Sequence, residues 1–352
     1  MDRYAAVAVQ STFLNIQCRD DMKRNLDHLA QGIRASYWLA SLEYPVKLIC
    51  FAEGAIQGFP DSMFDWDHVR ACKELMTTVP GPETDYLADI ARELNVFIAG
   101  QIRAVEAEII EDRYFNLAFV IDPKGKIVHK YHKLQVYPNE PSTVPHDVWD
   151  LWIEKFGYSL DSFYPVCDTE IGRIGTIICM DQSFPETARG LAMNGAEVIY
   201  MPTYVEPWAG RGWSELRART RALDNTCYVI APNPALGMIT ADSPHGWDIT
   251  GGNTIMCDYK GEVISHHIAG TDSFCSAMVD IEALRDFRDK SLFGNWLKDL
   301  RTEQYKVIYE QPIFPKNLFL HEPPPRRAGR QEIHRQSTRR LQERGVWKRP
   351  KG

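Results

Sequence analysis

The sequence predicts an α/β fold, and three observations support this prediction. Short apolar runs alternate with segments in which apolar residues recur every three or four positions, as expected for strands and helices in turn. Of the 352 residues, 44% are hydrophobic and 25% charged, the composition of an ordinary globular protein. Two pairs of apolar runs flank the turn sequences Pro-Lys-Gly (123–125) and Tyr-Lys-Gly (259–261), which indicates hairpins as well as crossover connections.

The predicted elements follow one another without a linker, so a single domain is expected over residues 1–284. The helix predicted at 21–42 carries apolar residues at spacings of three and four. The helix at 82–94 begins with proline and acidic residues, and two further helices are predicted at 185–194 and 213–224. Strands are predicted at 4–10, 46–53, 96–102, 115–122, 126–133, 173–179, 197–202, 227–231, 254–258, 262–268 and 276–281.

Composition argues against several classes of protein. No apolar run reaches 18 residues, so a membrane-spanning helix is not expected. The first residues show no basic segment followed by a long apolar run, which argues against a secretory signal and for a cytoplasmic location. The eight cysteines form no Cys-x-x-Cys pair, so neither disulfides nor a zinc site is expected, and no cofactor is predicted.

Positive charge is concentrated at the end of the chain. Residues 322–352 contain ten Lys or Arg against three Glu, although the whole protein has a formal net charge of −7. This segment is either a solvated appendage or an arm that lies across an acidic surface. Because the body shows no basic patch with interleaved aromatic residues, a nucleic-acid partner is not expected. We expect residues 285–352 to form a C-terminal extension that contributes to a homo-oligomer interface.

Three reactive residues end three of the predicted strands, namely Glu53, Lys133 and Cys179. The carboxyl ends of strands line the ligand crevice in open α/β sheets, so these side chains are candidates for one site. Together they would supply a base, a cation and a nucleophile, the groups needed to attack a carbonyl carbon. Each residue alone also has an ordinary structural explanation, as a cap, a solvated charge or a buried thiol.

The sequences around these residues resemble those of the nitrilase, or carbon–nitrogen hydrolase, superfamily. The likeness covers roughly residues 4–281. The segments that carry it are Phe-Ala-Glu (51–53) with Gly-Phe (58–59), Tyr-Phe-Asn (114–116) with Lys-Tyr-His-Lys (130–133), Ile-Ile-Cys-Met-Asp (177–181) with Phe-Pro-Glu (184–186), and Arg-Ala-Leu-Asp-Asn (221–225). Ala52, His132 and Asn253 depart from the residues that are common in the family.

The resemblance implies a four-layer α-β-β-α sandwich, assembly into homo-oligomers, and catalysis through a thioester on the cysteine. Cys179 would be the nucleophile and Glu53 the general base. Lys133, with the backbone N–H of Met180, would stabilise the oxyanion. Glu140, seven residues after Lys133, is the best match for a second acid known in many members.

The segment after the cysteine indicates a branch of the family. Met180-Asp181 stands where nitrile hydrolases usually carry Trp-Glu, and the arginines typical of N-carbamoyl-amino-acid hydrolases do not follow. The sequence is most similar to aliphatic amidases and formamidases, which implies a small neutral amide as substrate, with N-carbamoyl compounds and nitriles as alternatives. The segment 138–165 is predicted to be an insertion that shapes the pocket. Predicted pocket residues are Tyr137, Tyr204 and Trp208.

Two other classes of function stay open at this stage. A scaffold protein could keep this fold without catalysis, although the intact Glu53, Lys133 and Cys179 argue against it. A metal-dependent hydrolase could use four histidines, at positions 129, 132, 266 and 267. Residues an odd number of positions apart in a strand point to opposite faces. His129 and His132, like His266 and His267, are therefore poorly placed to bind one ion, and no metal site is predicted.

Overall fold

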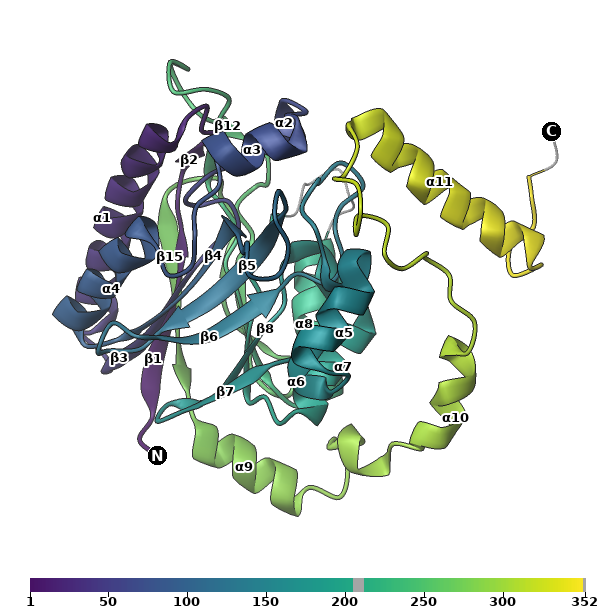
Figure 1. Ribbon diagram of the computed structural model, residues 1–352. Coiled ribbons are helices and arrows are strands. Elements are labelled where there is room, and N and C mark those ends of the chain that lie inside the picture. The colour runs from purple at the N-terminus through teal and green to yellow at the C-terminus, as the bar shows by residue number, and fades with distance from the viewer. Residues whose placement is uncertain (205–211, 351–352) are drawn as a thin grey trace.

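The structure is a computed structural model that describes residues 1–204 and 212–350. Within these residues two six-stranded sheets pack face to face, and helices cover the outer face of each sheet (Figure 1). The strand order is β15-β1-β3-β4-β5-β6 in the first sheet and β14-β13-β10-β9-β8-β7 in the second. The layers are helix, sheet, sheet and helix, which confirms the predicted α-β-β-α sandwich.

The strands have the following bounds. The first sheet contains β15 (Ser273–Val279), β1 (Tyr4–Gln10), β3 (Val46–Phe51), β4 (Phe97–Val105), β5 (Tyr114–Ile121) and β6 (Ile127–His132). The second contains β14 (Val263–His267), β13 (Thr254–Cys257), β10 (Tyr228–Ala231), β9 (Val198–Tyr200), β8 (Gly172–Thr176) and β7 (Val166–Thr169). A small third sheet, which the sequence did not predict, joins β12 (Trp247–Asp248), β11 (Leu236–Met238) and β2 (Phe13–Leu14).

Strand β1 shows why the central strands have continuous apolar sequences. Val7 and Val9 face the core between the first sheet and its helices, whereas Ala6 and Ala8 face the core between the two sheets. Both faces of the strand are buried, so the usual alternation of apolar and polar residues is absent. A third core lies between the second sheet and its helices. Three cores therefore hold the four layers together.

The four main helices form where the sequence predicts them, within two residues at each end. Helices α1 (Met22–Ala40) and α4 (Pro82–Leu94) cover the first sheet. Helices α7 (Pro185–Met193) and α8 (Trp213–Asn225) cover the second sheet. In the part of the chain described here, no helix has both the length and the apolar character needed to cross a bilayer.

Several shorter helices were not predicted. Two of them, α2 (Pro60–Met63) and α3 (His68–Glu74), follow strand β3, and a 3-10 turn η1 (Arg19–Asp21) precedes α1. The segment 138–165 folds mainly as helical turns, η2 (Pro145–Val148), α5 (Trp149–Phe156) and α6 (Leu160–Phe163). Local helices therefore account for most of the length that the sequence indicated as an insertion.

From residue 281 onward the chain forms a string of short helices followed by one long helix. These are α9 (Ile281–Lys290), η5 (Trp296–Asp299), α10 (Thr302–Lys306), η6 (Val307–Tyr309) and α11 (Arg327–Glu343). The strand predicted at 276–281 ends earlier, because the Asp280 side chain accepts a hydrogen bond from the Ala283 N–H and caps α9. Figure 1 shows the extension leaving the body after α9 and returning at the start of α11, whose far end projects away.

Candidate active site

A cavity of about 670 Å³ is lined by residues from the segments that follow strands β3, β6 and β8. Glu53, Glu140 and Cys179 line it directly. Lys133 does not line the cavity but forms ion pairs with both carboxylates. The structure therefore brings together the four side chains that the sequence singled out.

Lys133 is the centre of a buried polar cluster. Its Nζ atom donates hydrogen bonds to Glu53 Oε1 at 3.0 Å and to Glu140 Oε2 at 2.6 Å. The Asn116 Nδ2 atom donates to Glu53 Oε1 at 2.9 Å and to Glu140 Oε1 at 2.8 Å. Glu53 and Lys133 are each only 1% exposed. The two carboxylates thus share one ammonium and one amide, which fixes their positions relative to each other.

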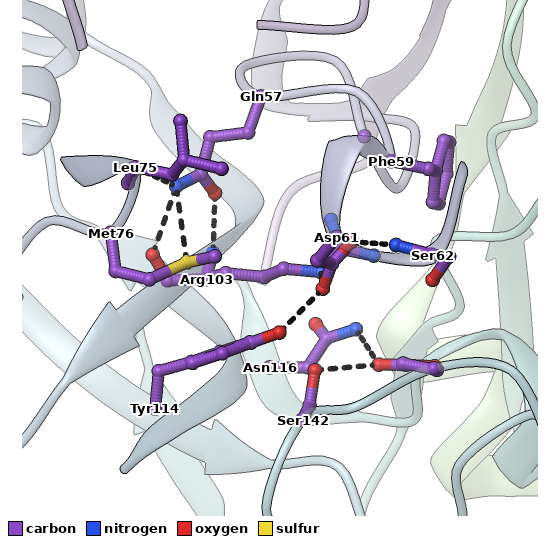
Figure 2. Close-up of polar contacts among 12 residues, drawn as sticks. Gln57, Phe59, Asp61, Ser62, Leu75, Met76, Arg103, Tyr114, Asn116 and Ser142 are labelled. Atoms are coloured by element: carbon purple, nitrogen blue, oxygen red, sulfur yellow. Dashed lines mark hydrogen bonds and ion pairs between the residues drawn. The ribbon is translucent and has the colours of Figure 1, made fainter. Parts of the chain in front are cut away.

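Further hydrogen bonds hold Asn116 in the orientation in which it bridges the two acids. Its Oδ1 atom accepts a hydrogen bond from Gln101 Nε2 at 2.6 Å, so its amide group must point its donors at the carboxylates. Its backbone oxygen accepts from the Lys133 N–H at 3.0 Å, which sets the position of the lysine. The Ser142 hydroxyl, drawn beside Asn116 in Figure 2, donates to Glu140 Oε1 at 3.0 Å.

Cys179 lies on a sharp turn rather than at the end of a strand, so the predicted strand 173–179 is too long. Strand β8 ends at Thr176, and Cys179 is the first residue of a 3-10 turn, η3 (Cys179–Ser183). The Ile178 N–H is bound by the Asp181 side chain at 3.0 Å instead of by a neighbouring strand. Cys179 has a φ of 46°, in the left-handed region that residues other than glycine rarely adopt. Such local strain is typical of functional sites.

Asp181 joins this turn to the segment that carries the lysine. Its Oδ2 atom accepts hydrogen bonds from the Ile178 N–H and, at 2.8 Å, from the Tyr131 hydroxyl. Its Oδ1 atom accepts from the two backbone N–H groups that follow Lys133, at 3.1 and 2.8 Å. Sequence reasoning did not identify this role, because Tyr131 and the two N–H groups after Lys133 lie 46 to 50 positions earlier in the chain.

The electrostatics of the cluster favour a neutral thiol beside charged neighbours. Burial, and then the Glu53 carboxylate, raise the pKa of the Cys179 thiol well above its ordinary value. Burial alone would lower the pKa of Lys133, but Glu140 and Glu53 outweigh it and the net shift is upward. Burial would raise the pKa of Glu140, but Lys133 and Arg103 outweigh it and the net shift is downward. The thiol therefore needs a base before it can act as a nucleophile.

The walls of the cavity combine aromatic side chains with polar and charged ones. Tyr137 and Tyr204, both predicted as pocket residues, line it, and the Tyr204 ring centroid lies 4.3 Å from that of Phe59. Trp208, the third predicted pocket residue, lies outside the described residues. Met180, whose backbone N–H the family resemblance predicts to bind the oxyanion, follows Cys179 in η3 and also lines the cavity. Lining residues that the sequence did not identify include Phe59, Ser62, Met63, Arg103, Trp213 and Arg217.

Arg103 is a buried cation in this wall. Its Nε atom lies 3.1 Å from Asp61 Oδ2, and its Nη1 atom donates to the Gly58 carbonyl oxygen at 2.8 Å. Asp61 also accepts a hydrogen bond from the Tyr114 hydroxyl at 2.9 Å (Figure 2). A signal for this residue was present, because Gln101 and Arg103 are polar residues two positions apart in an apolar strand and so share one face.

The alternative of a metal-dependent hydrolase gains no support from the geometry. Within residues 1–204 and 212–350, no group of three or more His, Cys, Asp or Glu side chains is placed to hold a metal ion. His132 pairs with Glu106 in a contact with a single carboxylate, and His129 is buried. The histidines in question therefore do not form a common site in these parts of the chain.

Comparison with known proteins assigns the family. The family model described as carbon-nitrogen hydrolase matches residues 5–289. The chain belongs to the carbon–nitrogen hydrolase family, as the motifs around Glu53, Lys133 and Cys179 indicated.

Individual relatives cover less of the sequence. A formamidase of Bacillus cereus (strain Q1) is 29% identical over 234 residues, which are 66% of this chain and 62% of that protein. A formamidase of Bacillus anthracis is 30% identical over 222 residues, 62% of this chain and 59% of that protein. The match with this chain thus spans less than two thirds of the length of either relative.

Solved structures share the fold at lower identity. Saccharomyces cerevisiae Nit3, a member of branch 10 of the nitrilase superfamily, aligns with a TM-score of 0.64 and 21% identity over 83% of this chain and 95% of that chain. An amidase from Nesterenkonia sp. aligns with a TM-score of 0.62 and 17% identity over 87% of this chain and 96% of that chain. These likenesses establish the sandwich architecture.

Proposed function

We propose that the protein hydrolyses a small neutral amide to a carboxylic acid and ammonia through a thioester on Cys179. The observation that carries this proposal is the cavity in which Cys179 lies with Glu53 and Glu140, both held by Lys133. Base, cation and nucleophile are the groups that acyl transfer at a carbonyl carbon requires. Formamidases among the relatives favour an amide as the substrate.

In the first half of the proposed reaction, Glu53 takes the thiol proton while the Cys179 sulfur forms a bond to the amide carbon. The carbonyl oxygen becomes an oxyanion, which the Lys133 ammonium and the Met180 backbone N–H stabilise. Collapse of the tetrahedral intermediate breaks the C–N bond, and the departing nitrogen receives the proton held by Glu53. Ammonia leaves, and the acyl group stays on sulfur as a thioester.

In the second half, water takes the place of ammonia. Glu53 accepts a proton from the water molecule as its oxygen attacks the thioester carbon, and the same oxyanion contacts act again. The C–S bond breaks, the sulfur regains the proton from Glu53, and the carboxylic acid leaves. Glu140 is the second acid in this scheme, and its short contact with Lys133 orients the ammonium throughout.

The proposal is tested by ammonia release from a panel of formamide, short aliphatic amides, aromatic amides, N-carbamoyl amino acids and nitriles. The wild type is compared with Cys179→Ala and with Cys18→Ala, an exposed cysteine that serves as the matched control. We expect turnover of amides by the wild type and the control and none by Cys179→Ala. Turnover that survives Cys179→Ala, or silence of the wild type across the panel, would overturn the proposal. Turnover of only carbamoyl compounds or only nitriles would replace the amide as substrate.

We also propose that residues 285–352 form the interface of a homo-oligomer. Leu292 and Phe293 are 90% and 83% exposed, and Ile308 on the same extension is also exposed. Large apolar side chains gathered on one exposed segment are typical of protein–protein contacts. Light scattering should give fewer chains per assembly for a Leu292→Asp, Phe293→Asp double variant and for a chain ending before Pro323. An unchanged number of chains per assembly in both variants would contradict the proposal.

The cysteines support the expected cytoplasmic location. All eight are free thiols, and most of them are buried. Free thiols persist in reducing compartments, so we propose that the protein works in the cytoplasm. A fractionation experiment that finds the protein only outside the cytoplasm would contradict this.

A further inference from the structure

The first turn of α11 packs against two loops that form one wall of the cavity. The first loop, residues 58–67, includes the short helix α2 and contributes Phe59, Ser62 and Met63 to the cavity lining. The second loop, residues 134–144, contributes the residues from Tyr137 to Glu140. The side chain of Arg330 contacts both loops and is only 4% exposed as a residue. A buried arginine of the C-terminal extension therefore connects two parts of the cavity wall.

Arg330 makes a short contact with the residue that precedes Glu140. Its Nη2 atom donates to the Asn139 carbonyl oxygen at 2.8 Å and lies 3.3 Å from Asp65 Oδ1. Its Nη1 atom donates to the Pro325 carbonyl oxygen at 2.6 Å, which fixes the guanidinium to its own segment. The neighbouring Gln331 adds a second bond, from Nε2 to Asn139 Oδ1 at 2.8 Å. Asn139 is thus held through both its backbone and its side chain.

Arg327 fixes the first loop in a similar way. Its backbone N–H donates to Asp65 Oδ1 at 2.8 Å. Its Nη2 atom donates to the carbonyl oxygens of Ser62 and Met63, at 2.6 and 3.1 Å. Hydrogen bonds from a charged group to backbone carbonyls are among the stronger ones in proteins. The start of α11 therefore supplies polar partners to the backbone of both loops.

These contacts lead directly to the second acid. The Glu140 N–H donates to the Tyr137 carbonyl oxygen at 2.8 Å, so Asn139 lies within a turn whose last residue is Glu140. A shift of the Asn139 carbonyl would move this turn and with it the Glu140 carboxylate that contacts Lys133. Misplacement of an active-site group by about 1 Å can lower a rate about 100-fold.

We propose that Arg330 is a positioning residue, which holds the second loop so that Glu140 keeps its contact with Lys133. The C-terminal extension is then a structural part of the active-site wall as well as an interface. The catalytic consequence rests on the proposed function, whereas the ordering of the loop does not. The two are therefore tested by separate measurements.

The kinetic test compares Arg330→Ala with Arg339→Ala. Arg339 lies on the same helix, is exposed, and pairs with Glu332, so it is a matched control. We expect kcat/KM to fall about 10- to 100-fold in Arg330→Ala and to stay unchanged in Arg339→Ala. Added guanidinium ion should restore part of the activity of Arg330→Ala. A purely structural arginine would lower Tm but leave kcat/KM of the folded enzyme unchanged and give no rescue, which would overturn the proposal.

A double-mutant cycle shows whether Arg330 acts through Glu140. In a Glu140→Gln background, Arg330→Ala should cost much less in kcat/KM than it costs in the wild type, because the group that it positions is already lost. Equal losses in both backgrounds would mean that Arg330 does not act through Glu140, and would overturn the proposal.

Hydrogen exchange gives a readout that does not depend on activity. Amides of residues 134–144 should exchange faster in Arg330→Ala than in the wild type or in Arg339→Ala. If the wild type turned over no amide, the proposed function would fail while this measurement still decided the role of Arg330. Unchanged protection of the loop in Arg330→Ala would overturn the inference.

Discussion

Glu140 is a closer partner of Lys133 than Glu53 is, with an Oε2–Nζ distance of 2.6 Å against 3.0 Å. A buried ion pair is stable only when further hydrogen bonds satisfy its remaining atoms, and Asn116 and Ser142 supply these to Glu140. In the proposed mechanism this contact makes Glu140 the group that orients the lysine. Glu53, with the longer contact, serves as the group that exchanges protons with Cys179.

Removal of the Glu140 charge should lower the rate. Glu140→Gln keeps the shape of the side chain but replaces a carboxylate by an amide, so Lys133 loses its closer counter-charge. We expect kcat/KM to fall about 100-fold or more, mainly through kcat. Steady-state ammonia release measures this, with Glu154→Gln at an exposed position as the control. If Glu140→Gln retained the wild-type kcat/KM, Glu140 would have no part in the chemistry.

Loss of Asp61 should destabilise the fold behind the cavity. Asp61→Ala leaves the buried Arg103 guanidinium without its carboxylate and the Tyr114 hydroxyl without its acceptor. Breaking a buried pair by removing one partner costs about 3–5 kcal/mol in the free energy of unfolding. Urea unfolding measures this, and Asp89→Ala, whose carboxylate lies in an exposed pair with Arg92, should change it by less than about 1 kcal/mol. Similar values for the two variants would show that the Asp61–Arg103 pair does not stabilise the protein.

The pH dependence of thiol labelling should follow from the raised pKa of Cys179. A thiol whose pKa lies above its ordinary value of 9.0 is protonated at neutral pH, and its thiolate fraction grows as the pH rises. The rate of alkylation of Cys179 by iodoacetamide should therefore increase about tenfold per pH unit from neutral pH upward, without a plateau below about pH 9. Peptide mass spectrometry follows this rate, with the exposed Cys18 as an internal control. A plateau near neutral pH would indicate a preformed thiolate and no need for a base.

The main helices and strands could be predicted from the sequence because their signals are local, whereas their arrangement in four layers was implied by the family resemblance. Strand β1 is buried on both faces and so has a continuous apolar sequence, and α4 has proline at its first position. The small sheet could not be predicted, since β2 and β12 have only two residues each. A strand of that length carries no pattern.

The site was predicted less completely because some of its residues act over long distances in the sequence. The motifs identified Glu53, Lys133, Glu140 and Cys179, but the turn at Cys179 depends on side-chain bonds of Asp181 that apolar patterning does not reveal. Helix α11 is polar on almost all sides, so no apolar stripe predicted it. Its contact with Asn139 spans 191 positions, and only the three-dimensional structure shows it.

The measurement that tests the central claim most directly is the detection of the acyl group on Cys179. The wild type is mixed with an amide that it turns over, quenched in acid, digested and analysed by peptide mass spectrometry. The account predicts that the peptide containing Cys179 gains the mass of the acyl group, and that no other cysteine peptide does. An acyl group on a different residue would contradict the account. So would the absence of any acyl group on Cys179 during steady-state turnover, if the Cys179→Ala variant were as active as the wild type.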